Sequence, residues 1–210
     1  MFIKILSKFE YLYLKGIEKD YYVKCSELAN LNQKMRDSSV LLKKVMKKLH
    51  GTKTVVYDIE DDRDGRVTFI CVQDLRTPSL NGDNNLYMKG DMNIFVMNER
   101  IYSSDCVYRF IDMPHLQATF YMNHIRIDEL HSCINSISYE NKGYGTMMLN
   151  TLIEIGKNSG CVSIGGCLSV QDAKTDEKRD NRNRFYLNRG FKLSFEDKDK
   201  TNGSISLEIN

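Results

Sequence analysis

The spacing of apolar residues changes at Gly51, and this change divides the chain into two parts. From Ser26 to His50 the apolar residues recur mostly every three or four positions, which predicts an amphipathic helix with Ser26 as its N-cap and Gly51 as its stop. The earlier stretch Phe2–Leu14 is compatible with a helix or a strand. We therefore expect residues 1–50 to form a helical N-terminal segment, either as part of the following domain or as an appendage to it.

Short extended segments follow Gly51. Thr54–Ile59 and Arg66–Gln73 are rich in β-branched and aromatic residues and flank a charged turn, which predicts a β-hairpin. Thr77–Asn85 combines Pro, Gly, Asn and Asp and is predicted to be a loop. The alternation of apolar residues changes parity near Asn123, which predicts a bulge or bend inside a long strand. The further extended segments are Asn93–Met97, Cys106–Ile111 and Gln117–Leu130.

Helices and strands alternate in the last third of the chain. The sequence KGYGT at 142–146 leads into an apolar helix that continues to Asn158, and Gly160 stops this helix. A buried strand (Cys161–Val170), a short helix (Asn181–Asn188) and a terminal pair of strands are expected next. The predicted fold class is therefore α/β, with a mixed, twisted sheet flanked by helices and preceded by the helical N-terminal segment.

Composition narrows the classes of protein that fit this pattern. Of the 210 residues, 41% are hydrophobic and 28% are charged, as in globular proteins. No apolar run approaches the ~20 residues that span a bilayer, and the first residues do not resemble a signal peptide, so we expect a cytoplasmic protein without a membrane partner. The six cysteines form no CxxC pair and the four histidines show no ligand spacing. We therefore expect reduced, mostly buried thiols and no metal site.

Positive charge is concentrated in residues 1–50, which hold eleven Lys or Arg against five Asp or Glu. The lysines between Lys43 and Lys48 alternate with apolar residues at helical spacing, which is typical of a solvated helix face. A nucleic-acid partner is therefore not expected; if the Lys43–Lys48 face did bind nucleic acid, binding would weaken steeply with added salt. A homodimer in which residues 1–50 are the dimerisation element is a further alternative.

A strand followed by KGYGT and a helix can form a cradle for a phosphate group. Glycines let the backbone approach an anion closely, and the unpaired N–H groups of the first helical turn can bind phosphate oxygens. Lys142 adds a positive charge. The two better-known phosphate motifs are absent, because no Lys-Ser/Thr pair follows Gly145 and Met148 stands at the third position of GxGxxG. A simple tight turn is the alternative.

Two motifs together resemble the GNAT superfamily of acetyl-CoA-dependent N-acetyltransferases. The first is ENKGYG at 140–145, similar to the family's (Arg/Gln)-x-x-Gly-x-(Gly/Ala) at the start of a helix, with Glu140 in place of Arg or Gln. The second is FYLNRGF at 185–191, similar to the family's Phe-Tyr-x-x-x-Gly-Phe. The resemblance covers roughly residues 51–210 and implies that they form an acetyl-CoA-binding acyltransferase domain.

The resemblance also implies a reaction and a cofactor site. The reaction is transfer of an acetyl group from acetyl-CoA to a primary amine of a small molecule or peptide, by direct attack in a ternary complex. The thioester is implied to lie in a V-shaped opening between Ile125–Ser132 and Ser163–Val170. The residues implied to bind acetyl-CoA are Ser132, Asn141, Lys142, Gly143, Tyr144, Gly145, Thr146 and Asn181.

Tyr186 matches the tyrosine that the family often places near the CoA sulfur, so it is the candidate general acid; a packed aromatic ring is the alternative. Glu129 is the candidate general base, because burial on the strand that borders the substrate would raise its pKa. The competing bases are Asp128, His131 and Asp172.

The sequence leaves two alternative functions open. The domain could be a catalytically degenerate GNAT-like binding or interaction module, which Glu140 favours. Separately, the acidic residues Glu60–Asp62 and Asp64 in the predicted hairpin turn could attract a cationic amine, or simply keep the turn solvated.

Overall fold

The computed structural model describes residues 2–80, 86–102, 113–131, 133–134, 137–138 and 141–209. The chain divides into two compact units, Met1–Lys47 and Lys48–Asn210. No helix within the described ranges combines the length and the hydropathy needed to span a membrane.

Helix α1 (Phe2–Leu49) is one uninterrupted helix of 48 residues. It includes Phe2–Leu14, where the sequence left helix and strand open, and it passes through Ser26, so the prediction of an N-cap at Ser26 is wrong. The helix ends two residues before Gly51, whose φ of +83° suits the predicted stop. Many apolar side chains along α1 are exposed, among them Val23, Leu28, Met35, Val40 and Met46.

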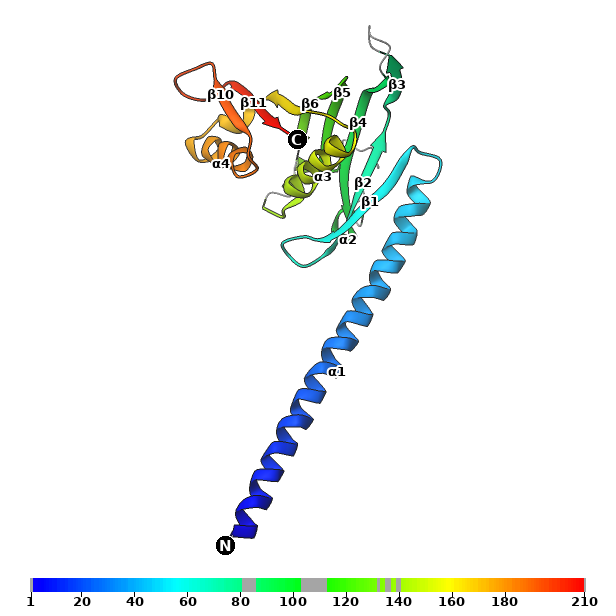
Figure 1. Cartoon of the computed structure of the whole chain (residues 1–210), viewed down its shortest axis with the longest axis vertical. Helices are drawn as coiled ribbons and strands as arrows, with labels where there is room; N and C mark the ends of the chain where they lie inside the picture. The colour runs from blue at the N-terminus through cyan, green and yellow to red at the C-terminus, as the bar shows by residue number, and fades with distance from the viewer. Residues whose placement is uncertain are drawn as a thin grey trace. The chain divides into compact units, whose positions relative to one another are not determined.

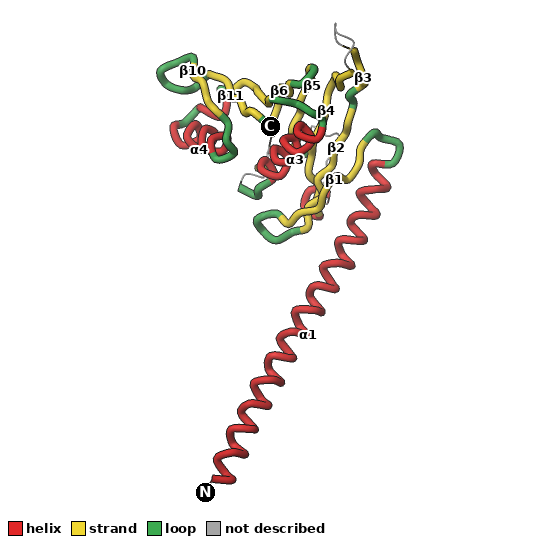
Figure 2. Tube along the Cα trace, viewed as in Figure 1, coloured by secondary structure: helices red, strands yellow, loops and turns green. Residues whose placement is uncertain are grey.

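The second unit is built on a twisted, mixed β-sheet (Figures 1 and 2). Its strands are β1 (Thr54–Asp61), β2 (Val67–Asp74), β3 (Thr77–Leu80), β4 (Leu86–Asn98), β5 (His115–Tyr121), β6 (His124–His131), β9 (Ser163–Cys167), β10 (Lys192–Phe195) and β11 (Gly203–Glu208). The spatial order is β1-β2-β4-β5-β6-β9-β11-β10, with β3 paired to β4. All neighbours are antiparallel except β6 and β9. The predicted mixed sheet is confirmed. The short strands β7 (Cys133–Ile134) and β8 (Ile137–Ser138) pair with each other outside this sheet.

The core lies at the centre of the sheet. Consecutive residues are buried in β2 (Phe69–Val72) and in β4 (Met92–Asn98), which means that both faces of these strands are covered. Helix α3 (Tyr144–Asn158) packs across β4, β5, β6 and β9. Its buried stripe contributes about 1.5–3 kcal/mol for each large apolar side chain. This stripe contains Met148, Leu149, Leu152 and Ile155.

Three short helices complete the described structure: α2 (Glu99–Tyr102), the 3-10 turn η2 (Gln171–Ala173) and α4 (Asp176–Leu187). The hydroxyl of Thr175 accepts a hydrogen bond from the Lys178 N–H at 3.3 Å and caps α4. The helix therefore begins five residues before the predicted start at Asn181.

Arg182 holds α4 against the chain segments around it. Its guanidinium is buried and donates to three main-chain carbonyls, those of Ser169, Lys200 and Thr201, at 2.8, 2.7 and 3.0 Å. Burial is the main reason that the pKa of Arg182 is lowered. The bonds fix the segment after β9 to the turn between β10 and β11.

Two details of the sequence interpretation are wrong. β5 and β6 are the two strands of a hairpin and not one bent strand; Met122, with a φ of 51°, lies in the turn that the change of parity marks. β3 occupies the first four residues of the predicted loop Thr77–Asn85, and residues 81–85 lie outside the described ranges. The predicted strand Cys106–Ile111 also lies outside them. The two predicted hairpins at 54–73 and 192–208 are confirmed.

The cysteines whose side chains are described are all free thiols, as expected. Cys71 and Cys161 are buried, and burial raises the pKa of Cys71 to about 12. Cys25 and Cys167 are exposed, so the described thiols are not mostly buried.

Candidate active site

β6 and β9 run side by side over only four residue pairs, which end at Ile127 of β6. The register of β6 against β5 shifts at the next residue, so that Asp128 forms a β-bulge. Cys167 at the end of β9 pairs with β11. In the described part of the chain, the β9-facing side of β6 beyond Ile127 therefore has no strand partner, and this is the place where the resemblance implied an opening.

A glycine makes the last close pairing before this opening possible. A Cβ added at Gly166 would lie 3.0 Å from the carbonyl oxygen of Ile127 and 3.3 Å from its Cβ. A larger residue at this position would require the neighbouring part of β6 to move by a few tenths of an ångström. The last close pair of β6 and β9 thus lies next to the bulge at Asp128.

The N-terminus of α3 lies at the same end of the sheet as this opening. β6, α3 and β9 form a crossover unit in which the two strands are parallel. The helix must run back along the sheet, so that it begins near the carboxyl ends of both strands. Ligands of open α/β sheets bind outside such strand ends.

The loop before α3 has the backbone geometry of an anion cradle. Asn141 and Gly143 have positive φ values of 64° and 90°, and no side chain caps the helix. The Thr146 N–H donates to the Gly143 carbonyl at 2.9 Å. Among the described residues, the N–H groups of Lys142, Gly143 and Gly145 meet no acceptor. Such groups at a helix N-terminus bind anions, because the helix dipole adds to their partial charges.

Arg63 and Lys142 bring positive charge to this loop. The Arg63 N–H donates to the Lys142 carbonyl at 3.1 Å, which joins the β1–β2 turn to the loop. The Arg63 side chain passes over Gly143, since its Cγ would lie 3.6 Å from a Cβ added there. The Lys142 ammonium lies 2.9 Å from a carboxylate oxygen of Asp64, so its charge is partly neutralised within the protein.

Arg189 also contacts the start of α3. Its guanidinium donates to the Thr146 hydroxyl and to the Phe185 carbonyl, and it lies 4.0 Å from the centre of the Phe185 ring. Burial lowers the pKa of Arg189, and the nearby charge of Arg63 lowers it further. Arg63 and Arg189 thus both bring positive charge to the start of α3, where an anion would relieve their repulsion.

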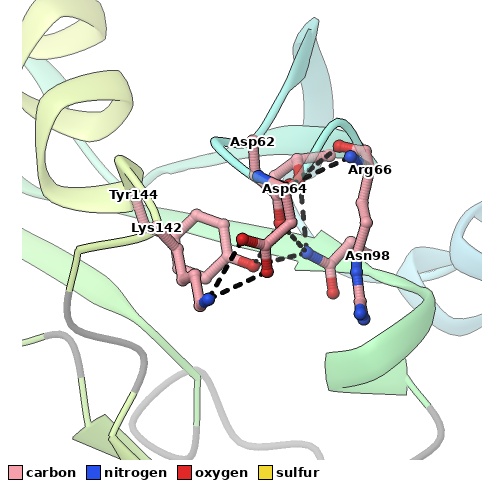
Figure 3. Close-up of polar contacts among 7 residues, drawn as sticks. Asp62, Asp64, Arg66, Asn98, Lys142 and Tyr144 are labelled. Carbon is pink, nitrogen blue, oxygen red and sulfur yellow. Dashed lines mark hydrogen bonds and ion pairs between the residues drawn. The ribbon is translucent and has the colours of Figure 1, made fainter.

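The Tyr144 side chain points into the core instead of toward the cradle (Figure 3). Its hydroxyl donates to Asp62 Oδ2 at 2.9 Å and accepts from Asn98 Nδ2 at 2.6 Å. Asp62 Oδ1 accepts from the N–H groups of Asp64 and Arg66, each at 2.9 Å. This buried network fixes the β1–β2 turn to the start of α3, so only the main chain of Tyr144 can take part in cofactor binding.

The same network assigns a structural role to two of the turn's acids. Asp62 is buried and accepts bonds from the protein, and Asp64 pairs with Lys142. Neither carboxylate is left to attract a cationic amine, which is one of the two roles that the sequence allowed.

Tyr186 lies on the buried face of α4, with its ring edge-on to Phe185 and Phe191 at centroid distances of 5.0 and 5.6 Å. Burial, together with the charge of Asp172, raises the pKa of Tyr186 to about 12. The phenol is therefore protonated at neutral pH and is able to donate a hydrogen bond. Complete transfer of its proton to a thiolate of pKa ~8.5 would cost about 5 kcal/mol.

Glu129 lies beyond the bulge, in the part of β6 that borders the opening. Half of its side chain is exposed, so the expectation that it is buried is wrong. Glu129 Oε2 lies 3.6 Å from His115 Nε2 and 3.7 Å from His131 Nε2. The absence of a metal site was expected from ligand spacing along the chain, but these three side chains come together across the β5–β6 hairpin.

The remaining predicted residues are less well placed. Asp128 accepts hydrogen bonds from Thr119 and from Arg126, the latter at 2.6 Å, so both of its carboxylate oxygens are engaged. Asn181 is exposed on α4, and its side-chain oxygen accepts from Arg184 at 2.8 Å. Ser132 lies outside the described residues.

The sequence interpretation did not single out Arg63, Arg189 or His115. Arg189 lies within FYLNRGF, where it could have been noticed as a cation beside the predicted cofactor site. Arg63 and His115 give no local signal, because their contacts are made with residues distant in the sequence.

No protein-family model matches this chain, and no curated protein matches it in sequence. The search of solved structures found acetyltransferases. The PaiA N-acetyltransferase from Thermoplasma acidophilum, in complex with coenzyme A, has a TM-score of 0.39 and 12% identity, over 57% of this chain and 61% of that chain. An acetyltransferase of the GNAT family from Staphylococcus aureus has a TM-score of 0.40 and 14% identity, over 58% and 69%. The chain is thus similar to acetyltransferases of this family at low sequence identity.

Proposed function

We propose that this protein is an N-acetyltransferase that transfers an acetyl group from acetyl-CoA to a primary amine of a small molecule or peptide. The observation that carries the proposal is the position of the loop before α3 relative to the strands β6 and β9. A loop whose N–H groups at Lys142, Gly143 and Gly145 can bind an anion begins α3 at the end of the sheet where β6 and β9 diverge.

Acetyl-CoA has chemical groups that suit both the loop before α3 and the unpaired side of β6. Its diphosphate suits the cradle, where Arg63 and Arg189 supply the charge that an Arg at position 140 would otherwise provide. Its pantetheine arm carries amide groups, which can pair with the main chain of β6 beyond Ile127 in the manner of an added strand.

The reaction we propose needs no covalent enzyme intermediate. The amine nitrogen attacks the thioester carbonyl, the new C–N bond forms and the C–S bond breaks, and CoA leaves as a thiolate. Glu129 takes the proton that the nitrogen loses, and the Tyr186 hydroxyl donates a hydrogen bond to the thiolate. Since a phenol of pKa about 12 holds its proton, we expect solvent to complete the protonation of the thiolate.

A thiol-release assay with a panel of amines tests the proposal. Tyr186→Phe keeps the ring packing and removes only the hydroxyl, so kcat should fall by about 10²-fold while the Kd for acetyl-CoA stays unchanged. Tyr121→Phe, which alters an exposed tyrosine on β5, is the control. Equal kcat values for Tyr186→Phe and the wild type would contradict the role of Tyr186.

The exposure of Glu129 favours a second candidate function. Because half of the Glu129 side chain is exposed, this carboxylate lacks the burial that was expected to raise its pKa and make it a base. In this second function the domain binds acetyl-CoA without turning it over, as a GNAT-like interaction module. Binding of acetyl-CoA with no thiol release from any amine in the panel is the result that distinguishes this module from an enzyme.

A further inference from the structure

The β5–β6 hairpin brings two imidazoles and a carboxylate to one point. His115 and His131 are directly opposite each other in the antiparallel register, and Glu129 is two residues from His131 on the same face of β6. The ligand atoms of the three side chains all lie within 4.8 Å of one another.

We propose that His115, Glu129 and His131 form a binding site for a divalent transition-metal ion, with zinc as the best fit. Tetrahedral zinc with bonds of about 2.0–2.1 Å holds its ligand atoms about 3.4 Å apart. Glu129 Oε2 is 3.6 Å from His115 Nε2 and 3.7 Å from His131 Nε2. Movements of a few tenths of an ångström would bring these pairs to bonding geometry.

The main chain prepares His115 for this role. Its Nδ1 lies 2.8 Å from the carbonyl oxygen of Met113, and a carbonyl can only accept, so the Nδ1 of a neutral imidazole carries the proton. The lone pair is then on Nε2, which is the atom that faces Glu129. The buried ring is held in one orientation, as metal-binding histidines are held by a hydrogen bond from the ring nitrogen that does not bind the metal.

The ligand set and its exposure indicate the kind of metal. Two imidazoles and one carboxylate suit Zn²⁺ and its first-row neighbours, whereas Mg²⁺ and Ca²⁺ prefer oxygen ligands alone. The side chains of Glu129 and His131 are 50% and 56% exposed, so an ion can enter from solvent and complete its coordination with water. Three protein ligands and an open position are typical of zinc sites that exchange a ligand.

One consequence rests on the proposed function. A Glu129 carboxylate bound to a metal cannot also accept a proton from the amine, so zinc should inhibit acetyl transfer. Metal binding itself does not depend on this. If zinc binds but does not inhibit acetyl transfer, Glu129 is not the base, and the proposed metal site still stands.

The test is calorimetric titration of the full chain with ZnCl₂, after treatment with a chelator and alkylation of accessible thiols. We expect one ion per chain. His131→Ala and Glu129→Gln should each weaken binding about tenfold or more, because the first removes an imidazole ligand and the second replaces a charged carboxylate by a weaker, neutral amide ligand. His124→Ala is the matched control, since His124 is an exposed histidine on the same strand that lies beside Ser163. Its affinity should equal that of the wild type.

CoCl₂ gives an independent readout that does not involve activity. A four- or five-coordinate Co²⁺ ion at the site should produce visible d–d absorption that His131→Ala reduces and His124→Ala does not. Circular dichroism confirms that the variants are folded. Absence of binding by the wild type, or equal affinity in wild type, His131→Ala and Glu129→Gln, would overturn the proposal.

Discussion

The Tyr144 hydroxyl and the Asp62 carboxylate form a 2.9 Å hydrogen bond in a buried network between the β1–β2 turn and the start of α3. Removing the hydroxyl in Tyr144→Phe leaves Asp62 Oδ2 and Asn98 Nδ2 each with one bond fewer. We expect the free energy of unfolding to fall by about 1–3 kcal/mol, because buried polar groups are costly to leave unsatisfied. Urea denaturation measures this change. Tyr121→Phe, at an exposed tyrosine, should remain within about 0.5 kcal/mol of the wild type; equal losses in the two variants would contradict the role of the network.

Arg63 is expected to contribute to binding through the charge that it brings to the cradle. Arg63→Gln should raise the Kd for acetyl-CoA about fivefold at low salt, since an exposed charged contact contributes about 1 kcal/mol. The difference should shrink as salt is added. Lys53→Gln makes the same change of charge beyond the opposite end of β1, an eight-residue strand roughly 26 Å long. An equal rise in Kd for Lys53→Gln would show that Arg63 acts only through net charge.

Arg76 and Asp74 give the stability a dependence on pH. Arg76 Nε and Nη2 donate to the carboxylate at 2.9 and 2.8 Å. Burial alone would raise the pKa of Asp74, but the bonds and charge of Arg76 outweigh it, so the pKa is lowered. Because the pKa of Asp74 is lower in the folded state than in the unfolded state, the ionised carboxylate stabilises the folded state at pH values above the unfolded pKa of about 3.9. This contribution is lost as the pH falls through the folded pKa.

Arg76→Met should therefore lower the free energy of unfolding near neutral pH, by roughly 1.5–3 kcal/mol for the hydrogen bonds to the charged group. The gap between variant and wild type should begin to narrow as the pH falls below about 4, the pKa of Asp74 in the unfolded state, and should narrow further as the pH falls through the lower folded pKa. Urea denaturation at a series of pH values measures the gap. A gap that is constant from neutral to acid pH would mean that Arg76 acts through its packing on Phe120 and its bond to Ser159.

Several elements of the fold could be predicted because their signals are local. The hairpin at 54–73 is marked by β-branched runs around a charged turn, and α3 by an apolar stripe between two glycines. The change of parity near Asn123 was also a real signal, but alternation alone does not distinguish a bulge from a turn. Met122 adopts a left-handed backbone conformation. A glycine or asparagine at this position would have predicted a turn, whereas a methionine does not.

The candidate site was only partly predictable, because its contacts join distant segments. The position of the loop at 141–146 followed from its glycines, but nothing in the sequence shows that Tyr144 turns inward to Asp62, 82 residues away. His115, Glu129 and His131 meet because the β5–β6 register places them on one face. A bulge at Asp128 decides that register, and a bulge leaves little trace in residue types.

We propose that helix α1 mediates a homodimer, the alternative that the sequence left open. Leu28 and Met35 are one heptad apart and their side chains are 59% and 62% exposed, which is the spacing of a coiled-coil seam. Light scattering should give twice the chain mass of 24.4 kDa for the wild type and the chain mass for Leu28→Glu/Met35→Glu. Ala29→Glu/Arg36→Glu, which alters the adjacent exposed positions, should remain dimeric. A monomeric wild type would contradict this prediction.

The most direct test of the central claim is calorimetric titration of the folded chain with acetyl-CoA and with S-acetylpantetheine, which lacks the diphosphate together with the adenosine 3′-phosphate. If the main-chain N–H groups of Lys142, Gly143 and Gly145 hold the diphosphate, acetyl-CoA should bind at one site per chain. It should bind at least about 10²-fold more tightly than S-acetylpantetheine, since two charge-assisted contacts contribute about 3 kcal/mol. Equal affinities, or no heat at millimolar acetyl-CoA, would contradict the account.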